Sequence, residues 1–566
     1  MRRTPPYRSV GAVEVPLNEP GARPGLPRTL HVTRFRDGET VRFSRSSGVV
    51  LASVLTLATA VPAAADPLTD FHRQPVSWSP CDETKVGPLE GLPLECATLV
   101  APVDYRNPAG DRLQVAISRL KATDPARRRG ILLVNPGGPG APGLGLPVQL
   151  GRQEIAQVYD LIGFDPRGVG QSTQLQCTVI DELPIKNQTR PADADFGVFT
   201  ANAKAEDHAC QEAGGALRPY INTNNTARDM DIIRAVLGEQ RTNYLGYSYG
   251  TQLGATYGTL FPSRLDRSVL DSALDPAKSW HEQDFDSVDA IRANIDLWAE
   301  WVAARNNTFA LGTSADAVKA AIEEIATALR TRSIAGMTEV SHLDYGIGFY
   351  TRYRESWASY ANRMQFALIE VRQGIKAAPS VAEDLANASR IARERTVLHT
   401  QEKAGVTVKC EWNWPDPQTS YREMRRYRQA MPYGGVVPEL MAPNPCAFRS
   451  FQRLQTPVRA TRGYPVGLVV QADGDTQTAY PNGVAMATAL GDTLISVRDD
   501  GNHGHYRYND CVTKLVDGYL VRGVLPPSRS SCPPYAEAPD IPVDTRSSLV
   551  APAIESLTAV ASRIHP

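Results

Sequence analysis

A serine flanked by two glycines is the residue in this sequence best placed to do chemistry. Residues 246–250 read G-Y-S-Y-G, with Ser248 at the centre. Residues 244–245 before them are typical of a strand end, and residues 251–257 after them of a helix. In that context the pattern predicts a sharp strand-to-helix turn that holds a nucleophilic serine hydroxyl out of a sheet. The alternative is an ordinary turn serine, because so short a pattern also arises by chance.

A carboxylate that could serve this serine follows a later apolar run. Residues 466–471 (VGLVVQ) predict a buried strand, and the loop after it carries Asp473 and Asp475. A carboxylate in such a loop can hold an imidazole in one tautomer and stabilise its positive charge. The residues themselves leave both aspartates open as the acid.

The base that this chemistry needs follows the next strand. Residues 494–497 (LISV) predict that strand, and the loop behind it carries His503 and His505. A serine hydroxyl is a poor nucleophile until an adjacent imidazole takes its proton. We favour His503 because it directly follows the tight Gly501–Asn502 turn, and His505 stays open as the alternative. The chain order of serine, aspartate and histidine is that of the α/β-hydrolase triad.

A glycine-rich loop supplies the remaining part of such a site. Residues 130–134 (GILLV) predict a central strand buried on both faces, and N-P-G-G-P-G follows at 135–140. Glycines let backbone N–H groups approach a ligand closely. We expect the N–H groups of Gly138 and Tyr249 to hold the oxyanion of a tetrahedral intermediate. A phosphate loop is disfavoured, because its G-K-[ST] ending is missing.

The elements that must position these residues alternate between strand and helix. A sheet whose strands alternate with helices is mostly parallel, and its ligand site lies at the carboxyl edge. We therefore expect an α/β-hydrolase fold with a mostly parallel central sheet. Arg167 either lies at the surface or braces the site loops by pairing with a buried carboxylate. The further predicted strands are 94–100, 113–120, 159–164 and 267–271, and a helix is predicted at 226–238.

The chain divides into four segments. A leader occupies 1–65, the two parts of the hydrolase core occupy 66–275 and 451–566, and a helical lid occupies 276–450. The lid segment shows no buried-strand runs, and Trp and Tyr are frequent in it. An insertion at this point would cover the carboxyl edge of the sheet and shape the substrate pocket. Helices are expected within it at 315–329 and 381–395.

Glu411 is the candidate substrate-binding residue of the lid. It lies beside Trp412 and Trp414. An acidic group next to aromatic rings could bind a substrate ammonium. The alternative is a packed cluster without a ligand.

The leader predicts export. Residues 48–61 are apolar, follow Arg42 and Arg45, and lead to an A-x-A cleavage site at 63–65. A membrane anchor would need about 20 apolar residues. We expect a secreted, extracellular protein without membrane anchoring after cleavage. A start of translation at Val41 instead of Met1 would give the leader an ordinary length.

All eight cysteines follow the leader, as expected for an exported protein with disulfides. Their spacing forms four neighbouring couples, from which we predict the bonds 81–96, 177–210, 410–446 and 511–532. No pattern indicates a metal or a cofactor. The net charge of -1 implies no general attraction to nucleic acid. We expect a monomer.

These motifs together resemble the secreted actinobacterial tripeptidyl aminopeptidases, α/β-hydrolases related to the prolyl aminopeptidases. The resemblance places the catalytic acid on Asp475 and implies peptidase activity through Ser248, Asp475 and His503. The lid carries little signature of the family. The matching segments are 135–140, 163–170 (GFDPRGVG), 246–251, 471–478, 502–504, 511–512 and 523–526 (GVLP).

We therefore expect a secreted serine exopeptidase that releases short peptides from the free N-termini of peptides or proteins. The released length, a tripeptide, is implied by the resemblance alone. The first alternative is a secreted carboxylesterase or lipase with the same triad. A binding protein on a hydrolase fold is a further alternative, which the complete triad disfavours.

Overall fold

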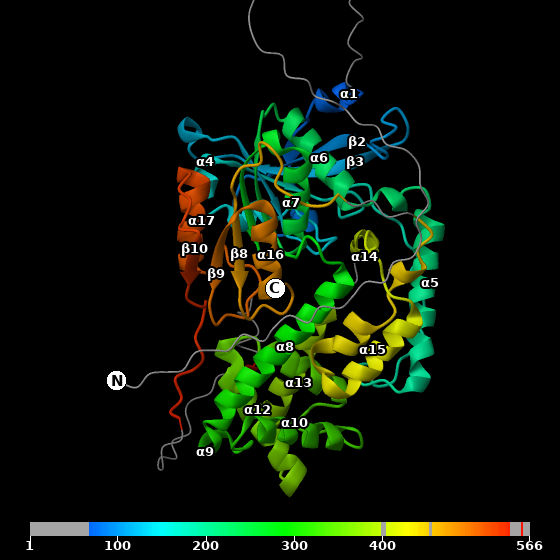
Figure 1. Cartoon of the computed structure of the whole chain (residues 1–566), viewed down its shortest axis with the longest axis vertical. Coiled ribbons are helices and arrows are strands. Elements are labelled where there is room, and N and C mark those ends of the chain that lie inside the picture. Colours follow the sequence, from blue (N-terminus) through cyan, green and yellow to red (C-terminus); the bar gives the residue numbers. More distant parts are fainter. Residues whose placement is uncertain (1–66, 398–402, 452–455, 544–555, 558–566) are drawn as a thin grey trace, which may run out of the picture. The chain divides into compact units, whose positions relative to one another are not determined.

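A sheet of ten strands is the centre of the computed structural model, which describes residues 67–397, 403–451, 456–543 and 556–557 (Figure 1). The strand order is β1-β2-β3-β5-β4-β6-β7-β8-β9-β10. The pairs β1–β2, β2–β3 and β3–β5 are antiparallel. All other pairs of neighbouring strands, from β5–β4 to β9–β10, are parallel. This confirms the predicted α/β fold with a mostly parallel sheet. The strands are β1 Ser79–Pro80, β2 Glu95–Pro102, β3 Arg112–Leu120, β4 Ile131–Asn135, β5 Asp160–Phe164, β6 Thr242–Tyr247, β7 Leu265–Asp271, β8 Leu468–Ala472, β9 Thr493–Val497 and β10 Arg529–Cys532.

Alternate residues of the central strands face two apolar cores, one on each side of the sheet. Ile131 and Leu133 of β4 pack with α6, α7 and α16, whereas Leu132 and Val134 pack with α3, α4 and α17. Coverage on both faces explains the continuous apolar runs of these strands. The helices outside the lid are α1 Thr69–His72, α2 Glu83–Val86, α3 Leu146–Leu150, α4 Ile155–Val158, α5 Phe196–Gly214, α6 Thr223–Val236, α7 Tyr249–Leu260, α16 Tyr480–Leu490 and α17 Asp510–Arg522.

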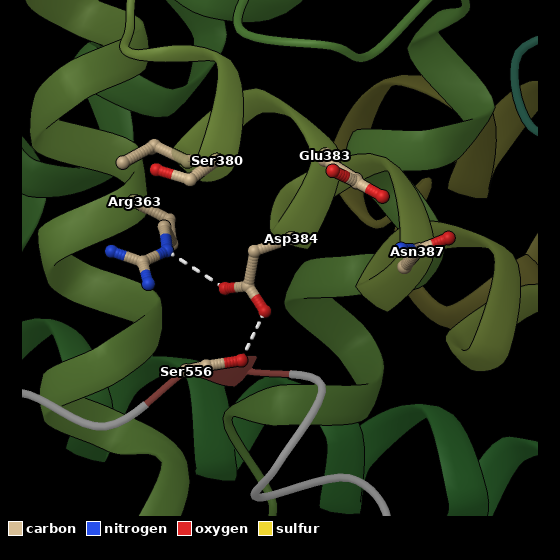
Figure 2. Close-up of a pocket in the computed structure, with 7 residues that line it drawn as sticks. Arg363, Ser380, Glu383, Asp384, Asn387 and Ser556 are labelled. Carbon is tan, nitrogen blue, oxygen red and sulfur yellow. Dashed lines mark hydrogen bonds and ion pairs between the residues drawn. The ribbon is translucent and has the colours of Figure 1, made fainter.

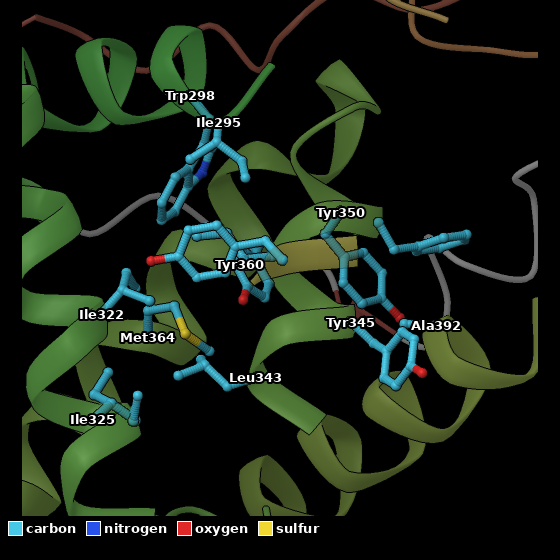
Figure 3. Close-up of a cluster of buried hydrophobic side chains, with 14 of the residues drawn as sticks. Ile295, Trp298, Ile322, Ile325, Leu343, Tyr345, Tyr350, Tyr360, Met364 and Ala392 are labelled. Carbon is cyan, nitrogen blue, oxygen red and sulfur yellow. The ribbon is translucent and has the colours of Figure 1, made fainter. Parts of the chain in front are cut away.

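The chain forms a helical lid with its own apolar core between β7 and β8. Figure 3 shows side chains from several lid helices gathered around Trp298, Tyr360 and Met364. The indole N–H of Trp298 donates to the carbonyl of Trp357 at 3.2 Å. The lid and the sheet belong to the same compact unit of the chain. The lid helices are α8 Trp280–Ala303, α9 Asn306–Phe309, α10 Ala315–Leu329, α11 Val340–Tyr350, α12 Trp357–Gln373, α13 Pro379–Val397, α14 Lys403–Lys409 and α15 Pro417–Ala430.

The core of the lid draws on more of the chain than residues 276–450. Phe196 and Phe199 of α5 are buried in it, and so are Ile541 and Leu557 near the carboxyl terminus. The segment bounds predicted from the sequence place these residues in the hydrolase core, because the stretch without buried-strand runs begins only after β7.

Four disulfides are present with the predicted partners. They are Cys81–Cys96, Cys177–Cys210, Cys410–Cys446 and Cys511–Cys532. The last of them joins α17 to the edge strand β10. The leader at 1–65, with its expected cleavage site and the possible start at Val41, lies outside the described residues. Across the described ranges, no helix has both the length and the apolar character needed to cross a membrane.

Candidate active site

Ser248 lies between the last residue of β6 and the first residue of α7. Its backbone has φ 56° and ψ -126°, a conformation that non-glycine residues rarely adopt. The turn is tight, because a Cβ added to Gly246 would lie 2.6 Å from the carbonyl oxygen of Gly250. Strained backbone of this kind is characteristic of a serine presented on a strand-to-helix turn.

Asp475 and His503 come together from the loops after β8 and β9. The Nδ1 atom of His503 lies 2.7 Å from Oδ2 of Asp475, and both side chains are buried. The hydroxyl of Thr478 donates to the same Oδ2 at 2.7 Å, and the N–H of Gln477 donates to Oδ1 at 2.9 Å. Burial alone would raise the pKa of Asp475. The charge and hydrogen bond of His503, together with the guanidinium of Arg352, outweigh burial and hold this pKa below its usual value.

The two alternative residues lie elsewhere. Asp473 is exposed, and its Oδ1 accepts a hydrogen bond from the N–H of Asp500 at 3.3 Å. His505 is 1% exposed, and its ring Nε2 has no hydrogen-bond partner among the described residues. The structure thus brings Asp475 and His503 together and leaves Asp473 and His505 outside the pair.

Asp271, at the end of β7, holds the serine turn and the histidine loop next to each other. Its carbonyl accepts from the N–H of Ser248 at 3.0 Å. Its carboxylate Oδ2 accepts from the N–H groups of His505 and Tyr506 at 2.9 and 2.7 Å. The sequence analysis missed this role. The only signal for it was a carboxylate at the carboxyl end of a predicted central strand.

The glycine-rich loop lies directly against the serine turn. The side-chain oxygen of Asn135 accepts from the N–H of Gly137 at 3.0 Å. A Cβ added to Gly137 would lie 2.9 Å from the Cβ of Ser248 and 3.2 Å from the backbone nitrogen of Tyr249. The expected oxyanion donors, Gly138 and Tyr249, therefore belong to two segments in contact. The N–H of Tyr249 opens α7, where the first N–H groups have no intrahelical acceptor.

Asp165 and Arg167 follow β5, and both side chains are buried. Arg167 is fully buried and donates to Asp229 through Nε at 2.7 Å and Nη2 at 2.6 Å. The expected pairing with a buried carboxylate is therefore present, and Arg167 does not lie at the surface. The Oδ1 atom of Asp165 accepts from the N–H groups of Gly143 and Leu144 at 2.8 and 3.2 Å. The segment 163–170 thus fixes the chain that follows the glycine-rich loop.

The lid reaches the glycine-rich loop through α14. A Cβ added to Gly405 would lie 2.1 Å from the carbonyl oxygen of Pro139. Backbone cannot yield at that distance without moving the loop, so any side chain at this position must displace the lid or the oxyanion donors.

We expect Gly405→Ala to lower kcat at least about tenfold, because small displacements of oxyanion donors are costly. Steady-state kinetics on a chromogenic substrate measures the effect. Gly197→Ala is the matched control, because a Cβ at this exposed helical glycine meets nothing within 4 Å. Equal kcat for both variants would show that the lid does not set the position of the loop.

Glu411 is a lid residue that contacts the start of α6. It is 7% exposed, and its Oε1 accepts a hydrogen bond from the N–H of Thr223. The hydroxyl of Thr223 lies 2.8 Å from the hydroxyl of Tyr249. Glu411 also lines a cavity of about 330 Å³ together with Trp412 and Gln252. Burial raises the pKa of Glu411 to about 8, although the hydrogen bonds from Thr223 oppose the rise.

A second cavity, of about 370 Å³, lies in the lid between α12 and α13 (Figure 2). Arg363 donates to Asp384 across it at 2.9 Å, and Ser556 contacts the same carboxylate. Neither Ser248 nor His503 lines it, so it is separate from the site described above.

The sheet, the serine turn and the paired loops define this protein as an α/β-hydrolase. The family model described as "alpha/beta hydrolase fold" matches residues 130–333, and that described as "TAP-like protein" matches residues 436–532. A tripeptidyl aminopeptidase of Streptomyces lividans is 32% identical over 464 residues, which are 78% of this chain and 84% of that relative.

Two mycobacterial relatives are also similar over most of their lengths. Serine protease Hip1 of Mycobacterium tuberculosis is 28% identical over 492 residues, 81% of this chain and 91% of the relative. Carboxylesterase B of the same organism is 29% identical over 512 residues, 84% of this chain and 96% of the relative. The chain belongs to the tripeptidyl aminopeptidase family, and with it to the serine hydrolases of aminopeptidase type.

Proposed function

We propose that this protein is a secreted serine exopeptidase that releases short peptides, most simply tripeptides, from free N-termini. Ser248 is the nucleophile, His503 the base and Asp475 the acid that orients it. The observation that carries the proposal is the buried pair of Asp475 and His503 at 2.7 Å. Asp271 accepts hydrogen bonds from both Ser248 and the loop that carries His503, and so holds the serine turn next to this loop. Export is supported by the leader pattern and by the four disulfides.

The reaction proceeds in two steps. The Oγ of Ser248 attacks the scissile carbonyl while His503 takes the hydroxyl proton. The N–H groups of Gly138 and Tyr249 stabilise the oxyanion, the C–N bond breaks, and His503 returns the proton to the leaving amine. A water then attacks the acyl-enzyme with His503 again as base, which frees the released peptide as a carboxylate and restores Ser248.

The lid supplies the preference for a free N-terminus in this proposal. An exopeptidase needs a closed end to its substrate site, and α14 of the lid lies directly on the glycine-rich loop. Glu411 is the group proposed to receive the substrate ammonium, because it lines a cavity next to the serine helix. Its alternative role is to cap the first turn of α6 through the N–H of Thr223.

Matched tripeptide p-nitroanilides with free and with acetylated N-termini test the activity. Cleavage of the free form alone, lost in Ser248→Ala, is the expected result. Cleavage of both forms at equal rates would indicate an endopeptidase instead. A carboxylesterase is the second candidate, because a relative with that name is similar to this chain over 96% of the relative's length. Turnover of simple esters without any turnover of free-amine peptides would establish the esterase and reject the exopeptidase.

We expect Glu411→Gln to stabilise the protein increasingly as the pH rises. The pKa of Glu411 is about 8 in the folded chain, and an unfolded glutamate titrates near 4.5. The native state therefore keeps a proton that the unfolded state releases, and wild-type stability falls as pH rises between these two values. Glutamine does not titrate, so its advantage should reach about 1–3 kcal/mol near pH 8 and be small near pH 5.

Thermal unfolding at pH 5, 6, 7 and 8 measures this difference. Glu537→Gln, at an exposed position, is the control and should show no such trend. A constant difference between Glu411→Gln and wild type would contradict a buried, protonated carboxyl. The same variant tests substrate binding. A substrate ammonium that pairs with Glu411 must displace this proton, so loss of the carboxylate should raise KM for free-amine peptides at least about tenfold.

A further inference from the structure

One lid side chain contacts both the acid loop and the base loop. Arg352, two residues after α11, is 4% exposed. Its Nε donates to the carbonyl of Gly501 at 2.7 Å, and its Nη2 lies 3.4 Å from Oδ1 of Asp475. Gly501 begins the turn that leads to His503. The guanidinium therefore bridges the two loops whose side chains form the buried pair.

The backbone of Arg352, like its side chain, lies directly against the base loop. A Cβ added to Gly501 would lie 1.9 Å from the carbonyl oxygen of Arg352. Only glycine allows this approach, so the tight turn that the sequence shows at 501–502 serves the contact with the lid as well as the direction of His503.

Two further lid side chains fasten the same loops. Arg354 donates to Asp499 at 2.7 Å and to the side-chain oxygen of Asn294 at 3.1 Å. The amide of Asn294 in turn donates to the carbonyl of Gly474 at 2.8 Å. The acid loop is thus held by α8 and by the segment after α11, and the base loop is held by that segment.

The two oxygens of Asp475 have separate partners. Oδ2 faces His503 and the hydroxyl of Thr478, whereas Oδ1 faces Arg352 and the N–H of Gln477. A guanidinium on the far oxygen fixes the plane of the carboxylate and opposes the addition of a proton to the pair. The pair then keeps the ionisation that a serine nucleophile needs toward lower pH.

We infer that Arg352 is a positioning residue of this enzyme, through which the docked lid holds Asp475 and His503 in the geometry for proton transfer. The inference rests on the proposed triad. It adds that the lid, besides enclosing the substrate, is part of the support of the catalytic groups.

Other charged groups on the loops around the pair have partners of their own. Asp473 lies 3.9 Å from Arg498, and the carboxylate of Asp500 accepts from the N–H groups of Asn502 and Tyr535. Further titratable or charged groups of the surrounding elements include Asp271, Arg354, Asp499 and His505.

The rate of Ser248 phosphonylation by a fluorophosphonate probe, in which the serine oxygen displaces fluoride from phosphorus, is measured between pH 5 and 9 and tests this role without requiring a particular substrate. For Arg352→Gln we expect the plateau rate to fall about tenfold, and the acidic limb to move up by roughly 0.5–1 pH unit. Arg352→Lys keeps the charge and one donor, so its acidic limb should match that of wild type while its plateau falls about threefold. Arg363→Gln is the matched control. It removes a buried lid arginine that pairs with Asp384 at 2.9 Å, and should change neither quantity (Figure 2).

An Arg352→Gln profile that superimposes on wild type would overturn the inference. So would equal shifts in Arg352→Gln and Arg363→Gln, which would indicate a general loosening of the lid. If Arg352→Gln does not fold, Arg352→Lys decides, and an unchanged plateau in that variant rejects the contact to Gly501 and Asp475 as a support. A wild-type protein that the probe does not label at Ser248 would reject the proposed triad and this inference with it.

Discussion

Ser248→Ala is expected to lower kcat by about 10⁴- to 10⁶-fold on every substrate that the wild type cleaves. Alanine removes the only atom of this residue that can form the acyl-enzyme. The fold should persist, because the turn is held by backbone hydrogen bonds, including the one from the N–H of Ser248 to Asp271. Kinetics on a tripeptide p-nitroanilide measure the loss of kcat. Intact-mass analysis after fluorophosphonate treatment measures the loss of the nucleophile.

Ser389→Ala is the control for this prediction. Ser389 is a buried serine in α13 of the lid, and its hydroxyl donates to the carbonyl of Leu385 one turn earlier. Its replacement should leave kcat within about a factor of two. A Ser248→Ala enzyme that retains more than about 1% of wild-type kcat would show that hydrolysis does not proceed through this serine.

The central sheet could be predicted because its strands are buried on both faces. Residues 130–134 show a continuous apolar run, and the structure has β4 there, between two cores. The edge strand β10 was missed, because its sequence R-S-S-C has no apolar run and its burial is partial. Its conformation comes from parallel pairing with β9 and from the Cys511–Cys532 bond, neither of which leaves a periodic pattern.

The helix α5 was missed for a related reason. Its buried residues Phe196 and Phe199 pack into the core of the lid, which lies far along the chain. A partner that distant is not visible in local periodicity. The same holds for Ile541 and Leu557, which pack into the lid from beyond the last strand.

The nucleophile, acid and base could be proposed from the sequence because each follows a strand in a recognisable order. Their supports could not. Asp271 bonds residues more than 200 positions away, and Arg352 contacts Asp475 and Gly501 across more than 100 positions. Such contacts depend on how the lid and the sheet meet, and no spacing rule connects their members.

Replacement of the catalytic histidine is expected to have the second large effect on activity, and it distinguishes His503 from His505. His503→Gln is expected to lower kcat/KM by about 10³- to 10⁴-fold, because glutamine cannot accept the serine proton. His505→Gln should stay within about threefold of wild type in kcat/KM, since the ring of His505 has no hydrogen-bond partner at Nε2 in the described part of the chain. Both variants are measured at the pH optimum, with thermal unfolding recorded alongside.

Thermal unfolding separates catalysis from packing in this comparison. His505 is more deeply buried than His503, so His505→Gln should be the less stable variant, by about 1–2 kcal/mol, although it keeps its activity. A base role for His505 would reverse the ranking of activity without reversing the ranking of stability. Activity lost only through unfolding would instead return in assays run at temperatures where both variants are fully folded. The two measurements together therefore decide which imidazole takes the proton of Ser248, and the 2.7 Å contact with Asp475 leads us to expect His503.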